Sequence, residues 1–108
     1  MSNLCEQNCE HQSGDFLNQE KISQYLTELQ ESWKQDEHRS VEFDFKFKNF
    51  HETMSFVNAV AWIANQQDHH PDLEVGYNHC LVRFSTHSVG GLSVNDFICA
   101  ARVEKLLS

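Results

Sequence analysis

Hydrophobic and charged residues alternate one by one between residues 41 and 48, the most regular pattern in the chain. The hydrophobic positions are Val41, Phe43, Phe45 and Phe47, and the charged positions between them are Glu42, Asp44, Lys46 and Lys48. Successive side chains of a strand point to opposite faces of a sheet. This period of two therefore predicts a strand with one buried face and one face in water.

Three other segments repeat their hydrophobic residues at intervals of three and four, as amphipathic helices do. One runs from about residue 49 to residue 67 and ends before Pro71, because proline disfavours helical backbone in the residue before it. Another begins after Asn18, a residue type that caps helices. The last begins at Ser93, and Asp96 follows at the spacing of a capping box. The sequence therefore predicts three helices.

Strand-like segments lie between the predicted helices. A short one starts at Trp33 and ends near Asp36, and two more cover about residues 73–77 and 79–86 with a turn at Asn78. Strands joined by short turns favour antiparallel pairing, and helices with one apolar stripe cover one face of a sheet. We expect the order α-β-β-α-β-β-α. This is a two-layer α+β domain with helices packed on one face of a four-stranded antiparallel sheet.

The first 16 residues are polar and have no hydrophobic period. We expect residues 1–16 to be a disordered tail and residues 17–108 to form a single domain, because a chain of 108 residues is too short for two independent cores. Cys5, Cys9 and His11 are residue types that bind metals, but no fourth ligand is evident near them. A mobile tail is the favoured interpretation.

The charge of the chain is acidic, with 16 Asp and Glu against 8 Lys and Arg and a formal net charge of −8. Binding to nucleic acid requires a basic surface, so this balance argues against a nucleic-acid partner. No apolar run is long enough to cross a membrane, and the first thirty residues lack the pattern of a signal peptide. We expect a cytoplasmic protein whose four cysteines are free thiols.

Three of the seven histidines stand where side chains project readily into a cleft. His69 and His70 come at the predicted end of a helix, just before Pro71, and His87 ends the last predicted strand. Histidine suits proton transfer, because its ordinary pKa of about 6.5 makes both protonation forms available near neutrality. Each position also has a purely structural interpretation. A histidine pair before a proline is often a solvated turn, His87 is a possible strand terminus, and Asp96 has the position of a helix cap.

The joint spacing of these residues resembles that of the pterin-4a-carbinolamine dehydratases. The residues that carry the resemblance are His69, His70, Pro71, Tyr77, His87 and Asp96. The sequences around them are similar to the family as well, and the resemblance runs from about residue 18 to the C-terminus. The chain departs from the family at Asn65, where an acidic or otherwise ionisable residue is usual. An amide hydrogen-bonds a pterin but accepts no proton.

The resemblance implies an enzyme that removes water from a 4a-hydroxytetrahydropterin to give quinonoid dihydropterin, in the recycling of tetrahydrobiopterin for an aromatic amino acid hydroxylase. It implies His69 and His87 as the acid–base pair and His70 as a third site histidine that mainly binds the pterin. No metal or other cofactor is implied. The remaining implied pterin contacts are Asn65, Pro71, Ser85 and Thr86. Asp96 is implied as an acid that orients one of the histidines. The resemblance also implies a homodimer or homotetramer.

Two other functions stay open at this stage. The resembled family includes dimerisation cofactors of transcription factors, and the acidic charge of this chain suits a protein partner rather than DNA. The second alternative is a metal protein with His69, His70, His79 and His87 as ligands. Adjacent histidines in an extended segment point to opposite sides, which makes them awkward ligands for one ion.

Overall fold

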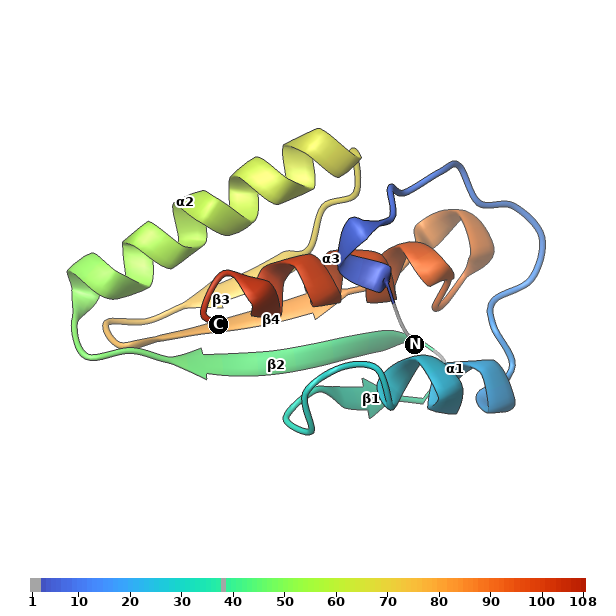
Figure 1. Cartoon of the computed structure of the whole chain (residues 1–108), viewed down its shortest axis with the longest axis horizontal. Coiled ribbons are helices and arrows are strands. Elements are labelled where there is room, and N and C mark those ends of the chain that lie inside the picture. Colours follow the sequence, from blue (N-terminus) through green and yellow to red (C-terminus); the bar gives the residue numbers. More distant parts are fainter. Residues whose placement is uncertain (1–2, 38) are drawn as a thin grey trace.

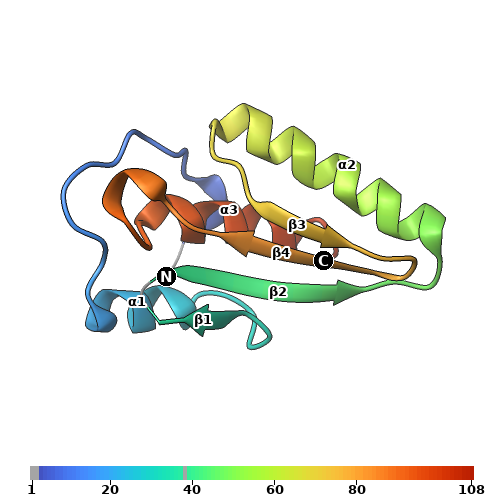
Figure 2. The same cartoon turned by 180° about the vertical axis from the view of Figure 1, so that it is seen from behind.

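The computed structural model describes residues 3–37 and 39–108. These residues contain one four-stranded antiparallel sheet (Figure 1, Figure 2). The strands lie in the order β1-β2-β4-β3, so the chain pairs β2 with β4 in the middle. Their bounds are β1 Lys34–Asp36, β2 Ser40–Lys46, β3 Asp72–Val75 and β4 His79–Phe84. The antiparallel sheet predicted from the sequence is confirmed.

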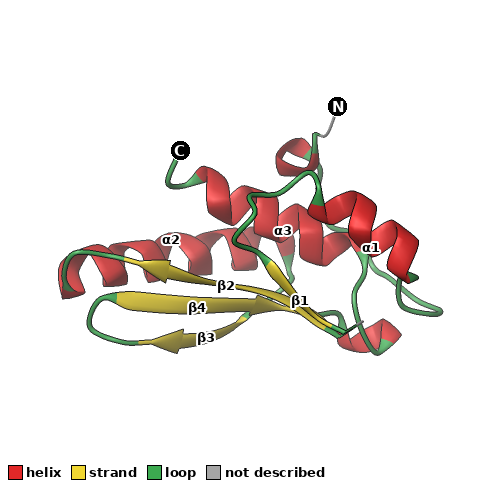
Figure 3. Cartoon of the chain, turned by 90° about the horizontal axis from the view of Figure 1, so that it is seen from below, coloured by secondary structure: helices red, strands yellow, loops and turns green. Residues whose placement is uncertain are grey.

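Three helices cover one face of this sheet, as Figure 3 shows. The helices are α1 Gln19–Leu26, α2 Phe50–Gln67 and α3 Val94–Lys105, and two short 3-10 helices are η1 Leu4–Glu6 and η2 His87–Val89. The two-layer α+β architecture and the order of its main elements are confirmed. Within the described residues, every helix is too short or too polar to span a membrane.

The inner face of the central strand pair carries hydrophobic residues that the alternating pattern predicted to be buried. In the register of β2 and β4, Val41 lies opposite Phe84 and Phe45 lies opposite Cys80. All four side chains are buried. Trp33 packs against this cluster, with its ring centroid 5.9 Å from that of Phe45. Burying one large apolar side chain contributes about 1.5–3 kcal/mol, so this face anchors the sheet to the helices.

Local capping sets the ends of α2 and the start of α3. The side chain of Asn49 accepts a hydrogen bond from the first turn of α2, and Asp68 ends the helix with a left-handed φ of 51°. Pro71 prevents the helix from continuing. α3 begins at a capping box formed by Ser93 and Asp96. Because α2 ends where it does, His69 in the loop that follows it reaches Asp96 in the first turn of α3.

The segment before α1 is held against the domain, beside α3 (Figure 1). Leu4 is buried, and the guanidinium of Arg102 donates two hydrogen bonds to the backbone oxygen of Gln7. This differs from the disordered tail expected for residues 1–16, of which residues 1 and 2 lie outside the described residues. One buried leucine and hydrogen bonds to backbone groups hold the segment, and neither produces a hydrophobic period. We call residues 3–12 the N-terminal strap.

The second strand pair is shorter than the sequence predicted. β3 ends at Val75, and Tyr77 is exposed in the turn that follows it. β4 ends at Phe84, and beyond it Thr86 makes only an isolated bridge. Residues 85–87 therefore belong to the loop between β4 and α3, although their burial continues the alternation of the strand, with Thr86 buried between the more exposed Ser85 and His87.

Candidate active site

Asp96 is the centre of a hydrogen-bond network at the start of α3. Its carboxylate is fully buried. Oδ2 accepts hydrogen bonds from the backbone N–H of Ser93 at 2.9 Å and from the hydroxyl of Thr86 at 2.7 Å. Oδ1 lies 2.6 Å from Nε2 of His69. The sequence offered two interpretations of Asp96, a helix cap or a partner of a histidine, and one carboxylate makes both contacts.

The contact with Asp96 holds the ring of His69 in a mostly buried position. The His69 side chain is 12% exposed, and its ring stacks on Phe84 with centroids 6.1 Å apart. Burial disfavours the charged ring, but the hydrogen bond and negative charge of Asp96 outweigh burial, and the pKa of His69 is raised above its ordinary value. Because Nε2 is bound to Asp96, a substrate would meet the other ring nitrogen, Nδ1.

Thr86 and Ser93 supply the polar surroundings that a buried carboxylate requires. Their hydroxyl oxygens are 2.7 Å apart, and both residues are buried. Burying a charge without hydrogen-bond partners costs free energy, and the donors around Asp96 offset that cost. The resemblance implied that Thr86 contacts the pterin, and its hydroxyl is directed at Asp96. Thr86 therefore supports the position of His69 through Asp96.

His70 has different surroundings from His69, although the two are adjacent. Its side chain is exposed, and its Nε2 lies 3.2 Å from Oδ1 of Asn65 in the last turns of α2. Asn65 is the position at which the chain departs from the family pattern, and its amide contacts the ring of His70. Pro71, the next residue, is partly exposed. His70 and Asn65 thus form a pair of their own beside the Asp96 network.

His87 begins η2, in the loop between β4 and α3. Its side chain is exposed, and Ser85 is partly exposed. Gly90 ends η2 with a φ of 72°, in the left-handed region that favours glycine. The backbone places His87 next to Thr86, which touches Asp96. No contact found among the described residues joins the His87 ring to His69.

A pocket of about 230 Å³ opens beside His69 and Thr86. Residues 9–12 of the N-terminal strap form one wall, and Gln67 and Asn95 belong to the others. In the described part of the chain, His70 and His87 do not line this pocket. The strap was not predicted as part of the site, since a polar segment without a period gives no indication of where it docks.

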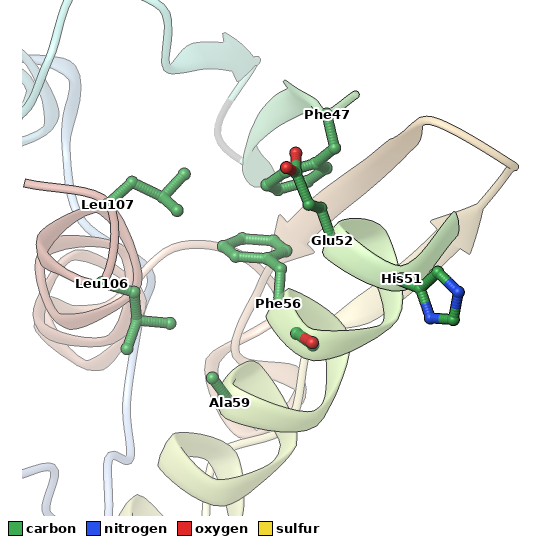
Figure 4. Close-up of a pocket in the computed structure, with 8 residues that line it drawn as sticks. Phe47, His51, Glu52, Phe56, Ala59, Leu106 and Leu107 are labelled. Atoms are coloured by element: carbon green, nitrogen blue, oxygen red, sulfur yellow. The ribbon is translucent and has the colours of Figure 1, made fainter. Parts of the chain in front are cut away.

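A second and larger pocket lies at the N-terminal end of α2, opposite the end from which His69 follows (Figure 4). Its volume is about 450 Å³, and its lining is mainly apolar, with Phe56 facing Leu106 and Leu107 (Figure 4). The carboxylate of Glu52 accepts a hydrogen bond from the backbone of Lys48 at 3.0 Å, so it belongs to the helix start. His51 also belongs to the lining, but its ring points away from Phe56 and the two leucines (Figure 4). The larger pocket therefore offers less acid–base chemistry than the one beside His69.

The structure separates His79 from the other histidines of the metal-site alternative. His79 begins β4, whereas His87 follows the end of this six-residue strand. A strand of that length spans about 20 Å. Nδ1 of His79 lies 3.0 Å from Oδ1 of Asp44. Over residues 3–37 and 39–108, no three side chains of His, Cys, Asp or Glu are grouped so as to hold a metal ion.

Comparison with known proteins identifies the family of this chain. Residues 15–106 match the family model described as Pterin 4 alpha carbinolamine dehydratase. The chain belongs to this family. A relative from Legionella pneumophila (strain Corby) is 52% identical over 109 residues, which cover 98% of this chain and 96% of the relative. A relative from Nitrosomonas eutropha is 46% identical over 112 residues, or 99% and 98% of the two chains. Both carry pterin-4-alpha-carbinolamine dehydratase as a provisional name.

A solved structure agrees with this assignment. The crystal structure of a transcriptional coactivator/pterin dehydratase from Brucella melitensis has a TM-score of 0.80 and 27% identity, covering 87% of this chain and 100% of that one. His69, Thr86 and Asp96 all lie within the residues that match the pterin-4a-carbinolamine dehydratase family. The N-terminal strap precedes residue 15, where the match to the family begins. One wall of the pocket is therefore formed by residues outside that match.

Proposed function

We propose that the chain is a 4a-hydroxytetrahydropterin dehydratase that uses histidines as general acid and general base. The observation that carries this proposal is the 2.6 Å contact between His69 and the buried carboxylate of Asp96. This contact orients a histidine beside a pocket and stabilises its protonated form. Membership of the pterin-4a-carbinolamine dehydratase family supports the reaction, and the geometry supports the choice of His69.

The proposed reaction breaks the C4a–O bond of the substrate. A proton is delivered to the departing hydroxyl, which leaves as water. The proton on N5 is removed, and a double bond forms between N5 and C4a, which gives the quinonoid dihydropterin. One acid and one base are therefore needed, and no proton is gained or lost overall. Histidine performs both steps near neutral pH.

We assign the acid to His69, because its raised pKa leaves more of the ring protonated near neutrality. The proton would leave from Nδ1, since Nε2 is held by Asp96. His87 is the proposed base. Its exposed ring lies next in the chain to Thr86, which contacts the same carboxylate.

The proposed binding contacts lie around this acid–base pair. His70 is exposed and oriented by the amide of Asn65, which suits a side chain that contacts the pterin ring. Pro71 and Ser85 are partly exposed. Pro71 follows His70 directly in the chain, and Ser85 stands two residues before His87. We propose that these residues fix the orientation of the pterin while His69 and His87 move protons.

A stopped-flow assay tests the proposal directly. An aromatic amino acid hydroxylase generates the 4a-carbinolamine, and its decay is followed with and without the protein. This source of substrate also matches the proposed role in tetrahydrobiopterin recycling. Catalytic amounts of the protein should accelerate the decay, and His69→Gln should remove most of the acceleration. A folded wild-type protein that leaves the decay rate unchanged would contradict the proposal.

We also propose that the protein acts as a homo-oligomer. β1 and β3 are the two edges of the sheet, and exposed edges favour pairing with another chain. Trp62 on α2 is 65% exposed and Tyr77 in the turn between β3 and β4 is 66% exposed, and Trp and Tyr are residue types enriched at protein interfaces. Sedimentation at micromolar protein should give at least twice the chain mass of 12.6 kDa. A monomeric profile would contradict this.

Binding to a transcription regulator is a second candidate function. The observations that favour it are the similarity to a transcriptional coactivator/pterin dehydratase from Brucella melitensis and the exposed Trp62 of this chain. Absence of dehydratase activity in the folded protein, together with specific binding of a transcription regulator, would favour this function over catalysis. Activity without such binding would favour the dehydratase.

A further inference from the structure

The N-terminal strap is attached to one face of α3. Asn95, Cys99 and Arg102 are spaced by four and three residues, so their side chains lie along one side of the helix. Asn95 exchanges two hydrogen bonds with the backbone of Glu10, at 3.2 and 2.7 Å. Arg102 bonds the backbone oxygen of Gln7 at 2.7 Å. The strap therefore has a polar attachment on each side of Cys99.

Cys9 lies between these two attachments and meets Cys99. The two Sγ atoms are 3.5 Å apart, and both cysteines are free thiols. Cys9 is partly exposed and lines the pocket beside His69, whereas Cys99 is fully buried in the core. A small reagent that enters the pocket would therefore reach Cys9 first.

The two thiols differ in their readiness to react. The hydrogen bond with Cys99 lowers the pKa of Cys9, and although burial opposes this, the nearby positive charges of His69 and Arg102 help to keep the pKa below its ordinary value. The same hydrogen bond and burial raise the pKa of Cys99. The thiolate is the reactive form of cysteine, so Cys9 is suited to attack first and Cys99 to react second.

We propose that Cys9 and Cys99 form a reversible disulfide that locks the N-terminal strap in place as a wall of the pocket beside His69. The oxidant is a small-molecule disulfide, RSSR. The Cys9 thiolate attacks one of its sulfurs, which gives a mixed disulfide and releases RS⁻. Cys99 then loses its proton, attacks the sulfur of Cys9 and releases the second RS⁻. In total, two protein thiols and RSSR yield one protein disulfide and two RSH, and two electrons pass to the reagent.

The disulfide has a mechanical consequence for the pocket. Residues 9–12 form one of its walls, and a covalent bond at Cys9 would fix this wall to α3. A disulfide that closes a long loop also restricts the unfolded chain and stabilises the folded one. In a reducing compartment such bonds are transient and serve as redox sensors, which suits a lock that opens and closes. The lock does not depend on the dehydratase reaction.

The test uses the full-length protein and glutathione disulfide as the probe. After incubation and alkylation of the remaining thiols, mass spectrometry should find Cys9 linked to Cys99. The melting temperature should rise by about 5 °C or more, and dithiothreitol should reverse the rise. Cys5→Ser is the matched control, because Cys5 lies in the same strap, and this variant should form the disulfide as the wild type does. Cys9→Ser should not form it.

Three outcomes would overturn the proposal: a link between Cys5 and Cys9, a stable glutathione adduct on Cys9 without closure to Cys99, or no reaction. Cys80 gives an internal reference, because burial raises the pKa of its thiol to about 11 and it should stay unmodified. Cys9→Ser alters a partly exposed residue, so the test holds even if substitutions at the buried Cys99 prevent folding. None of these readouts uses dehydratase activity, so failure here is distinct from failure of the proposed function.

Discussion

The two loops that carry the proposed site histidines are built differently. In the loop after α2, His69 is mostly buried, stacked on Phe84 and bound to Asp96. In the loop before α3, the side chain of His87 is exposed at the start of a short 3-10 helix. The loops meet at Asp96, which contacts His69 through one oxygen and Thr86, the neighbour of His87, through the other.

A histidine held by contacts and a histidine exposed to water suit different tasks. His69 is oriented before the proposed pterin substrate arrives, so little entropy would be lost on binding. His87 is accessible to water and can exchange protons with it. The comparison therefore predicts that substitutions in the first loop affect both turnover and stability, whereas substitutions of His87 affect turnover alone.

The largest loss of activity is expected for His69→Gln. The amide of glutamine can still reach Asp96, but it neither donates nor accepts a proton in the reaction. General acid–base catalysis contributes about 10²–10⁴-fold, so turnover should fall by about that factor in a single-turnover assay. Near-normal turnover would show that His69 does not carry a proton in the reaction. A thermal melt on the same sample separates this effect from unfolding.

His87→Gln should lower turnover by about 10²-fold, the lower end of the contribution of a proton carrier. Because the side chain is exposed, the free energy of unfolding should change by no more than about 0.5 kcal/mol. Denaturant titration and the decay assay measure the two quantities. A clear loss of stability here would remove the contrast between the two loops.

Asp96→Asn should affect turnover and stability together. The amide replaces a buried carboxylate that accepts from Ser93, Thr86 and His69. Hydrogen bonds to charged groups contribute about 1.5–3 kcal/mol, so unfolding should become easier by about that amount and turnover should fall by about 10–100-fold. Thr86→Val is the matched control, since it keeps the shape and removes one donor, and its effects should be smaller. An unchanged turnover would return Asp96 to a purely structural role.

The smallest expected effect is a dependence of stability on pH. A histidine whose pKa is raised in the folded state binds its proton more tightly there than in the unfolded chain. The resulting stabilisation is complete below the unfolded pKa of about 6.5 and is lost as pH rises through the raised folded value. The difference in unfolding free energy between wild type and His69→Gln should therefore shrink as pH rises through this range. A difference that grows with pH would contradict the assigned direction.

Local patterns predicted the fold better than they predicted the site. The alternation in β2 and the caps at Asn18 and Ser93 involve neighbouring residues, so the sequence indicates them directly. The contact of His69 with Asp96 joins residues 27 positions apart, and only the spacing shared with a known family pointed to it. The strap depends on bonds such as that of Arg102 to Gln7, which span 95 positions and leave no period in the sequence.

A titration of His69 decides whether Asp96 stabilises the charged form of this ring. NMR of the imidazole across a pH series gives its pKa in the wild type and in Asp96→Asn. We expect a wild-type pKa above the ordinary value of about 6.5 and a lower pKa in Asp96→Asn. A wild-type pKa at or below the ordinary value, or one that Asp96→Asn leaves unchanged, would show that Asp96 does not stabilise the charged ring of His69.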